Sequence, residues 1–286
     1  MKKPYLLKML SVTLLATFVL AGNSNAIVIR HDKPANDYLA NQDDFPPLAT
    51  FYNIGVHGTL IAPQWVLTAA HTVFCLDEGQ IIKIGDERAE VEARYSYPTY
   101  KLGKNNDLAL IKLKAPVVNA QPAKIYRKHN EDGQTVWFIG SGGTGTGLTG
   151  ETVGYKDNNG TLRKARNRVE SVSKSDLTFI FDSEDDGVEL EGVSGNGDSG
   201  GPAFIAVDGE YYLLGISSRT GSWFKGVGEY GVKELYTRVS VHAEWIDEVI
   251  AADKEQRSRI ASQDPFLQSG MTPDNIGQIC ESIRAC

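Results

Sequence analysis

Residues 58–70 read GTLIAPQWVLTAA, two short apolar runs on either side of a proline. Similar runs, bounded by Gly, Asn, Asp and Pro, recur between about residues 48 and 241: LATFYNIG (48–55), LALIKL (108–113), TVWFIG (135–140), PAFIAV (202–207) and YYLLGISS (211–218). Runs of this kind are typical of strands, and helical periodicity is scarce among them. Many such strands predict an all-β sandwich or barrel rather than an α/β fold.

One helix is expected late in the chain, over residues 242–252. Its apolar residues share one helical face: Trp245, Ile246, Val249 and Ile250. We expect this face to pack against the β structure. The extension that follows, residues 253–286, is polar and shows no pattern that assigns it a role.

The first 26 residues have the features of a secretory signal peptide. Basic residues at Lys2 and Lys3 precede an apolar run from Met9 to Leu20, and Ser24-Asn25-Ala26 offers small residues at the cleavage positions. The run is shorter than the roughly 20 residues that span a bilayer, which disfavours a membrane anchor. We therefore predict a protein that is secreted or periplasmic.

The charge and the cysteines narrow the classes of partner. The formal charge of −7 becomes −10 when residues 1–26 are removed, because they hold three lysines and no acids. An acidic surface repels phosphate backbones, so no nucleic-acid partner is expected. Cys75, Cys280 and Cys286 allow at most one disulfide after export, and the sequence leaves all three pairings open.

A serine stands between glycines in the segment GDSGG at residues 197–201. Glycine permits a tight backbone that exposes the hydroxyl and aims neighbouring N–H groups at one point, which suits acyl transfer. The pattern G-x-S-x-G also occurs in α/β-hydrolases, whose acid and histidine follow the serine. Here the only later histidine is His242, inside the expected helix, and no strand–helix alternation surrounds Ser199. That alternative is therefore disfavoured.

Four segments occur in one order: WVLTAAH (65–71), NNDLALIKL (105–113), GNGDSGGP (195–202) and LYTRVSVHAEWI (235–246). They resemble the signature segments of the chymotrypsin-like serine proteases (trypsin family), here taken as a secreted bacterial type, over most of residues 27–250. The resemblance implies two six-stranded antiparallel β-barrels with the active site in the cleft between them. The protease domain would span residues 27–252, with a first barrel at about 27–130 and a second at about 131–241.

The resemblance assigns a catalytic triad of His71, Asp107 and Ser199. His71 would take the proton of the Ser199 hydroxyl and return it to the leaving amine. Asp107 would fix the histidine tautomer, and the N–H groups of Gly197 and Ser199 would form the oxyanion hole. The expected activity is that of a serine endopeptidase; the alternative is a catalytically silent binding protein on the same fold.

The expected partners are a protein or peptide substrate and a proteinaceous inhibitor, with the mature chain a soluble monomer that does not contact membranes. No cofactor and no metal are expected. Residues 145–150 spell G-x-G-x-x-G, but no helix follows, so a loop of the second barrel is favoured over a dinucleotide site. The acids of residues 182–186 lack the calcium-loop pattern.

In the family, a mature N-terminal Ile or Val pairs with the Asp before the catalytic serine. Signal cleavage after Ala26 would expose Ile27, and Asp198 is the waiting partner. We therefore expect an activation ion pair between Ile27 and Asp198, formed by export itself. The two glycines usually found next are absent, and cleavage after Ala21 would instead leave a five-residue propeptide, residues 22–26.

The resemblance also assigns Val193, Ser218, Thr220 and Glu234 to the primary substrate pocket. Val193 stands where an Asp selects Lys or Arg, so that device is absent. Ser218 would pair with the substrate backbone and Thr220 would narrow the entrance. Glu234 would attract a basic side chain, take an internal partner such as Arg219, or turn to solvent. We expect basic residues before the cut, with small aliphatic residues second.

Overall fold

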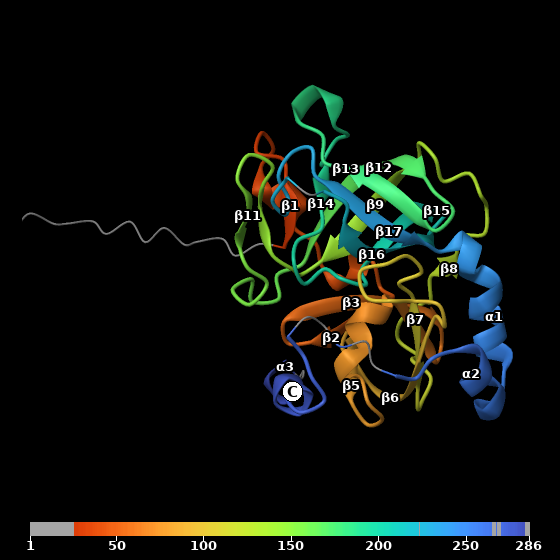
Figure 1. Ribbon diagram of the computed structural model, residues 1–286. Coiled ribbons are helices and arrows are strands. Elements are labelled where there is room, and N and C mark those ends of the chain that lie inside the picture. The colour runs from red at the N-terminus through yellow and green to blue at the C-terminus, as the bar shows by residue number, and fades with distance from the viewer. Residues whose placement is uncertain (1–25, 223, 265–266, 268–269, 284–286) are drawn as a thin grey trace, which may run out of the picture.

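The computed structural model describes residues 26–222, 224–264, 267 and 270–283, so the expected signal peptide lies almost wholly outside it. Two β-barrels are stacked in Figure 1, the second above the first. The predicted all-β fold of two six-stranded antiparallel barrels with a C-terminal helix is confirmed.

The first barrel closes in the order β2-β3-β4-β7-β6-β5. Its strands are β2 (Leu48–Tyr52), β3 (Gly55–Ala62), β4 (Trp65–Thr68), β5 (Ile81–Ile84), β6 (Glu87–Ser96) and β7 (Ala109–Leu113). Strand β4 pairs antiparallel with β7, and Thr68 lies opposite Ala109. This register brings the residues that follow β4 close to the residues that precede β7.

The second barrel closes in the order β15-β9-β12-β13-β17-β16, with β16 paired back to β15 and β8 added parallel to β16. Its strands are β8 (Lys124–Ile125), β9 (Thr135–Gly140), β12 (Arg163–Val172), β13 (Asp176–Ile180), β15 (Pro202–Val207), β16 (Glu210–Thr220) and β17 (Lys233–Arg238). Its interior contains an aromatic cluster of Phe138, Phe179 and Tyr236, with ring centroids 4.9–5.0 Å apart. Such contacts stabilise a core beyond simple area burial.

A small sheet lies beside the second barrel in the order β11-β10-β1-β14. Its strands are β1 (Ile27–Ile29), β10 (Thr144–Thr146), β11 (Gly150–Val153) and β14 (Gly192–Val193). Residues 27–29, expected within the first barrel region, thus run beside strands from the second half of the chain. The glycine-rich residues 145–150 form the turn of the β10–β11 hairpin.

The helices are short and lie in the connections between strands and at the C-terminal end. They are η1 (Ala35–Tyr38), η2 (Gln42–Asp44), η3 (Ala70–Cys75), η4 (Glu184–Asp186), η5 (Ser240–His242), α1 (Ala243–Ala251), α2 (Lys254–Ile260) and α3 (Ile276–Ile283). The expected terminal helix is α1, which packs between residues of both barrels such as Leu110 and Leu213. No helix among the described residues is both long and apolar enough to cross a membrane.

The extension beyond α1 returns to the first barrel. A disulfide joins Cys75, at the end of η3, to Cys280 in α3, with the two Cα atoms 5.4 Å apart. The sequence had left this pairing open, and Cys286 lies outside the described residues. In Figure 1, α3 lies next to β2 and β3.

Candidate active site

His71 and Asp107 lie together where β4 ends and β7 begins. His71 lies in η3, just after β4, and Asp107 lies just before β7. The two residues form two hydrogen bonds: His71 Nδ1 to Asp107 Oδ2 at 2.6 Å, and the His71 backbone N–H to Oδ1 at 2.9 Å. Because the carboxylate accepts from Nδ1, the ring proton is held there and Nε2 keeps its lone pair. The structure therefore brings together the two members of the expected triad that must act as a pair.

Asp107 is buried, with 2% of its surface exposed. Burial opposes its ionisation, but the charge and hydrogen bonds of His71, with a bond from Ser218, outweigh burial and hold the pKa of Asp107 below its ordinary value. Ser218 Oγ donates to Oδ2 at 2.7 Å, and Thr237 Oγ1 donates to the Asp107 carbonyl oxygen at 2.9 Å. Both hydroxyls come from the second barrel, so the carboxylate is fixed from across the cleft.

Arg219 extends this fixation. Its guanidinium donates to both carboxylate oxygens of Asp176, at 3.1 and 3.0 Å, and to Asn105 Oδ1 of the first barrel at 2.8 Å. The same group donates to Ser218 Oγ at 3.3 Å, which leaves the Ser218 proton directed at Asp107. Sequence reasoning missed Asp176 and Asn105 because nothing local marks a bond between residues so far apart along the chain.

Ser199 lies in a loop whose backbone conformation requires glycine at position 197. Gly197 has φ +95°, and a Cβ there would lie 2.8 Å from the Tyr155 side chain. The loop is fastened to β3, since the Val56 N–H donates to Gly197 O at 2.7 Å and the His57 N–H donates to Ser199 O at 2.9 Å. No described residue accepts a hydrogen bond from the N–H groups of Gly197 and Ser199.

Asp198 is buried next to Ile27. Its carboxylate accepts from the Gly142 N–H at 2.6 Å and the Gly195 N–H at 2.9 Å, and the Ile27 backbone also donates to it. Burial nevertheless raises the pKa of Asp198 to about 7. This carboxylate is therefore hydrogen-bonded, but no described Lys or Arg forms an ion pair with it.

His57 does not supply a positive charge to Asp198. Its Nε2 lies 3.8 Å from Asp198 Oδ1 but accepts a hydrogen bond from the Ser141 N–H at 2.9 Å, so Nε2 carries no proton. Burial lowers the pKa of His57 to about 4, which keeps the ring neutral. This second His–Asp contact is consequently structural, in contrast to the hydrogen-bonded pair of His71 and Asp107.

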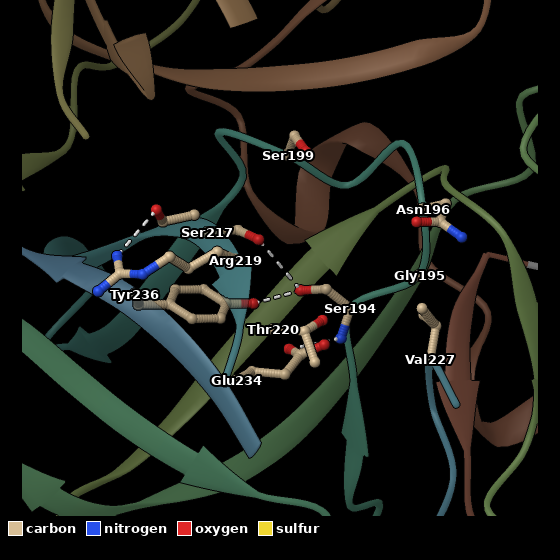
Figure 2. Close-up of a pocket in the computed structure, with 11 residues that line it drawn as sticks. Ser194, Gly195, Asn196, Ser199, Ser217, Arg219, Thr220, Val227, Glu234 and Tyr236 are labelled. Atoms are coloured by element: carbon tan, nitrogen blue, oxygen red, sulfur yellow. Dashed lines mark hydrogen bonds between the residues drawn. The ribbon is translucent and has the colours of Figure 1, made fainter. Parts of the chain in front are cut away.

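A pocket of about 150 Å³ opens beside Ser199 (Figure 2). Of the expected pocket residues, Ser218, Thr220 and Glu234 line it. Others were not expected: Ser194, Gly195, Asn196, Ser217, Arg219, Val227 and Tyr236. Val193 does not line the pocket; it is fully buried and packs in a cluster with Val28. Because strand residues alternate in direction, Val193 facing that cluster turns the adjacent Ser194 toward the pocket.

Glu234 faces Ser199 from the opposite side of the pocket in Figure 2. Its carboxylate accepts from the Ser194 N–H at 3.1 Å, and burial raises the pKa of Glu234 to about 8. Arg219, the internal partner that the sequence offered, binds Asp176 instead. Within the described part of the chain, no cation forms an ion pair with Glu234.

Two closed barrels, a buried Asp107 hydrogen-bonded to His71, and Ser199 in a glycine-rich loop define the class of this protein: it is a serine endopeptidase. A family model described as Trypsin matches residues 38–246, and the chain therefore belongs to the trypsin family.

Two relatives are similar over most of this chain. "Serine protease SSP1" of Scolopendra subspinipes is 28% identical over 279 residues, which cover 86% of this chain and 94% of the relative. "Vitamin K-dependent protein C" of Rattus norvegicus is 24% identical over 247 residues, which cover 75% of this chain but only 51% of that protein. Both relatives come from animals and lend no support to the expected bacterial type.

Among the residues that the structure describes, no cluster of three or more His, Cys, Asp or Glu side chains could hold a metal ion. The acids of residues 182–186 lie in and around η4 as a surface turn in which Glu184, Asp185 and Asp186 are exposed.

Proposed function

We propose that the chain is an exported serine endopeptidase whose catalytic triad is His71, Asp107 and Ser199. The observation that carries this proposal is the 2.6 Å hydrogen bond from His71 Nδ1 to Asp107, whose carboxylate also accepts from Ser218, a residue that lines the same pocket as Ser199. The leader of residues 1–26 supports a secreted or periplasmic location. A protein or peptide is the substrate, and a proteinaceous inhibitor would occupy the same cleft of a monomeric enzyme.

The chemistry follows from the positions of the groups. His71 Nε2 removes the proton of Ser199 Oγ as the oxygen attacks the scissile carbonyl carbon, and Asp107 stabilises the imidazolium that forms. The N–H groups of Gly197 and Ser199 bind the developing oxyanion. Collapse of the intermediate passes the proton to the leaving amine and leaves an acyl-enzyme on Ser199. Water, activated by the same His71, then releases the acid.

The pocket supports a preference for basic residues before the cut, with small aliphatic residues second. Glu234 is a buried carboxylate without a cation, and a buried charge is stabilised by a partner of opposite sign. Hydroxyls of Ser194, Ser217 and Tyr236 line the same space, which suits the polar end of a long side chain. A chromogenic peptide library that varies only the residue before the cut tests this preference; fastest cleavage after a large apolar residue would contradict it.

Replacing Glu234 by Gln is expected to lower kcat/KM for a Lys substrate by about 10²-fold, because a desolvated charged contact is lost. The ratio of Lys to Met cleavage should rise between pH 6 and pH 9, since Glu234 is neutral below its raised pKa of about 8 and charged above it. In Glu234→Gln the ratio should not change with pH. Thr220→Val is the matched control and should keep the pH dependence; a ratio that is flat in the native enzyme overturns the assignment.

A further inference from the structure

The extension after α1 contacts two elements of the first barrel that adjoin the proposed catalytic residues. Its last described element, α3, packs Ile276, Cys280 and Ile283 into the core cluster of the first barrel. From there it touches two elements next to the active site: η3, which contains His71, and the turn between β2 and β3.

The first contact is covalent. Cys75 closes η3, and its disulfide to Cys280 spans 205 residues of sequence. Tyr52 secures the same short helix, since its hydroxyl donates to Thr72 O at 2.6 Å and accepts from the Cys75 N–H at 3.3 Å. His71 directly precedes Thr72 in the same short helix, so a shift of η3 moves the imidazole.

The second contact holds the β2–β3 turn. The Asn53 N–H donates to Ile283 O at 3.0 Å, and the Asn53 side-chain amide donates to Ser282 O at 3.4 Å. Three residues further along, the Val56 N–H holds Gly197 O at 2.7 Å. The β2–β3 segment is therefore hydrogen-bonded to α3 through Asn53 and to the loop of the proposed oxyanion hole through Val56.

This turn needs such support because its backbone is strained. Gly55 and Val56 have φ +90° and +69°. A β-branched residue rarely adopts the left-handed conformation, and strain of this kind persists only where surrounding contacts enforce it. The contacts from Gly197 and from Asn53 with α3 provide that enforcement.

We propose that α3 is a brace that positions the catalytic histidine and the oxyanion loop, with the Cys75–Cys280 bond as its fastening. The brace contacts neither substrate nor pocket, so its residues are positioning residues. It acts on the transition state through geometry, where a displacement of about 1 Å can cost 10²-fold in rate. This inference rests on the triad and oxyanion hole proposed above.

The test removes the Cys75–Cys280 disulfide and compares that variant with a control variant of similar stability. Cys75→Ala/Cys280→Ala is expected to lower kcat about 10-fold, per active site titrated with a burst reagent, and to leave KM for a short peptide within about twofold. Affinity for a peptide boronate, which mimics the tetrahedral intermediate, should fall by the same factor as kcat. Leu113→Ala serves as the control, because it removes a buried side chain of the same barrel core from β7, a strand that pairs with β4 and β6 rather than with η3 or the β2–β3 turn.

The control should lose thermal stability but keep kcat. A second variant, Ile283→Ala, keeps the disulfide and loosens only α3; it should lower kcat about threefold and add little in the Cys75→Ala/Cys280→Ala background, because both act through one brace. Unchanged kcat in both brace variants overturns the proposal, as does an equal loss in Leu113→Ala. If instead the native enzyme fails to react with the burst reagent, the proposed triad is at fault rather than the brace.

Discussion

Ser199→Ala should lower kcat by about 10⁶-fold and leave KM nearly unchanged, because the acyl-enzyme cannot form while the pocket stays intact. His71→Ala should have an effect of similar size, because an unassisted hydroxyl is a weak nucleophile. The two residues act as one unit, so the double variant should be hardly slower than either single variant. Steady-state hydrolysis of a peptide substrate by purified protein measures all three.

The fold should survive these changes, since Ser199 is only half-buried and its hydroxyl supports no described hydrogen bond. Thermal unfolding provides the check. A loss of less than about 10²-fold in Ser199→Ala, with the protein folded, would show that another group attacks the carbonyl.

Asp198→Asn should lower kcat/KM by about 10²- to 10³-fold in protein that begins at Ile27. A buried ion pair that loses one partner leaves the other charge uncompensated, at a cost of roughly 3–5 kcal/mol. In the chain that retains residues 1–26, burial raises the pKa of Asp198 to about 7 although the Ile27 backbone donates a hydrogen bond to it. A positive charge at this position would favour the ionised carboxylate. The new ammonium group would supply that positive charge.

The pH profile checks the same pair independently. An α-amino group ionises near pH 8 in the unfolded chain, and pairing with Asp198 raises that value. The stabilisation is therefore complete below about pH 8 and is lost as the pH rises through the higher pKa of the paired amine, so activity should fall at alkaline pH. N-terminal sequencing must show Ile27 in the active form; activity that is flat to pH 11, or full activity in chains that retain residues 22–26, contradicts the pairing.

The all-β class was predictable from local apolar runs, whereas the two barrels and the His71–Asp107 pair were predictable from the family resemblance of a few short segments. Strands β4 and β7 each stand out as a short apolar run, and their antiparallel pairing places the residues after β4 next to those before β7. The expected triad thus depended on short segments whose geometry the barrel fixes. The residues that line the pocket were harder to predict. Whether Val193 or Ser194 faces the pocket depends on the pairing of β14 with β1, which the sequence does not reveal.

Two long-range contacts that no motif marks were not predicted. Three cysteines offer three pairings, and only the return of α3 to the first barrel selects Cys75–Cys280. The same holds for Arg219, whose choice of Asp176 over Glu234 is decided by how β13 and β16 lie in the second barrel. Because Arg219 binds Asp176, no described cation forms an ion pair with Glu234, and the pocket is lined by an unpaired carboxyl group.

The central claim is that Ser199 is an activated nucleophile, and covalent labelling tests it most directly. Mature protein beginning at Ile27 should react with a fluorophosphonate probe, and peptide mapping by mass spectrometry should place the phosphonyl group on Ser199. Ser199→Ala should not be labelled, and His71→Ala should be labelled far more slowly. Folded mature protein that remains unlabelled, or that carries the label on another residue, would contradict the account and favour a catalytically silent binding protein.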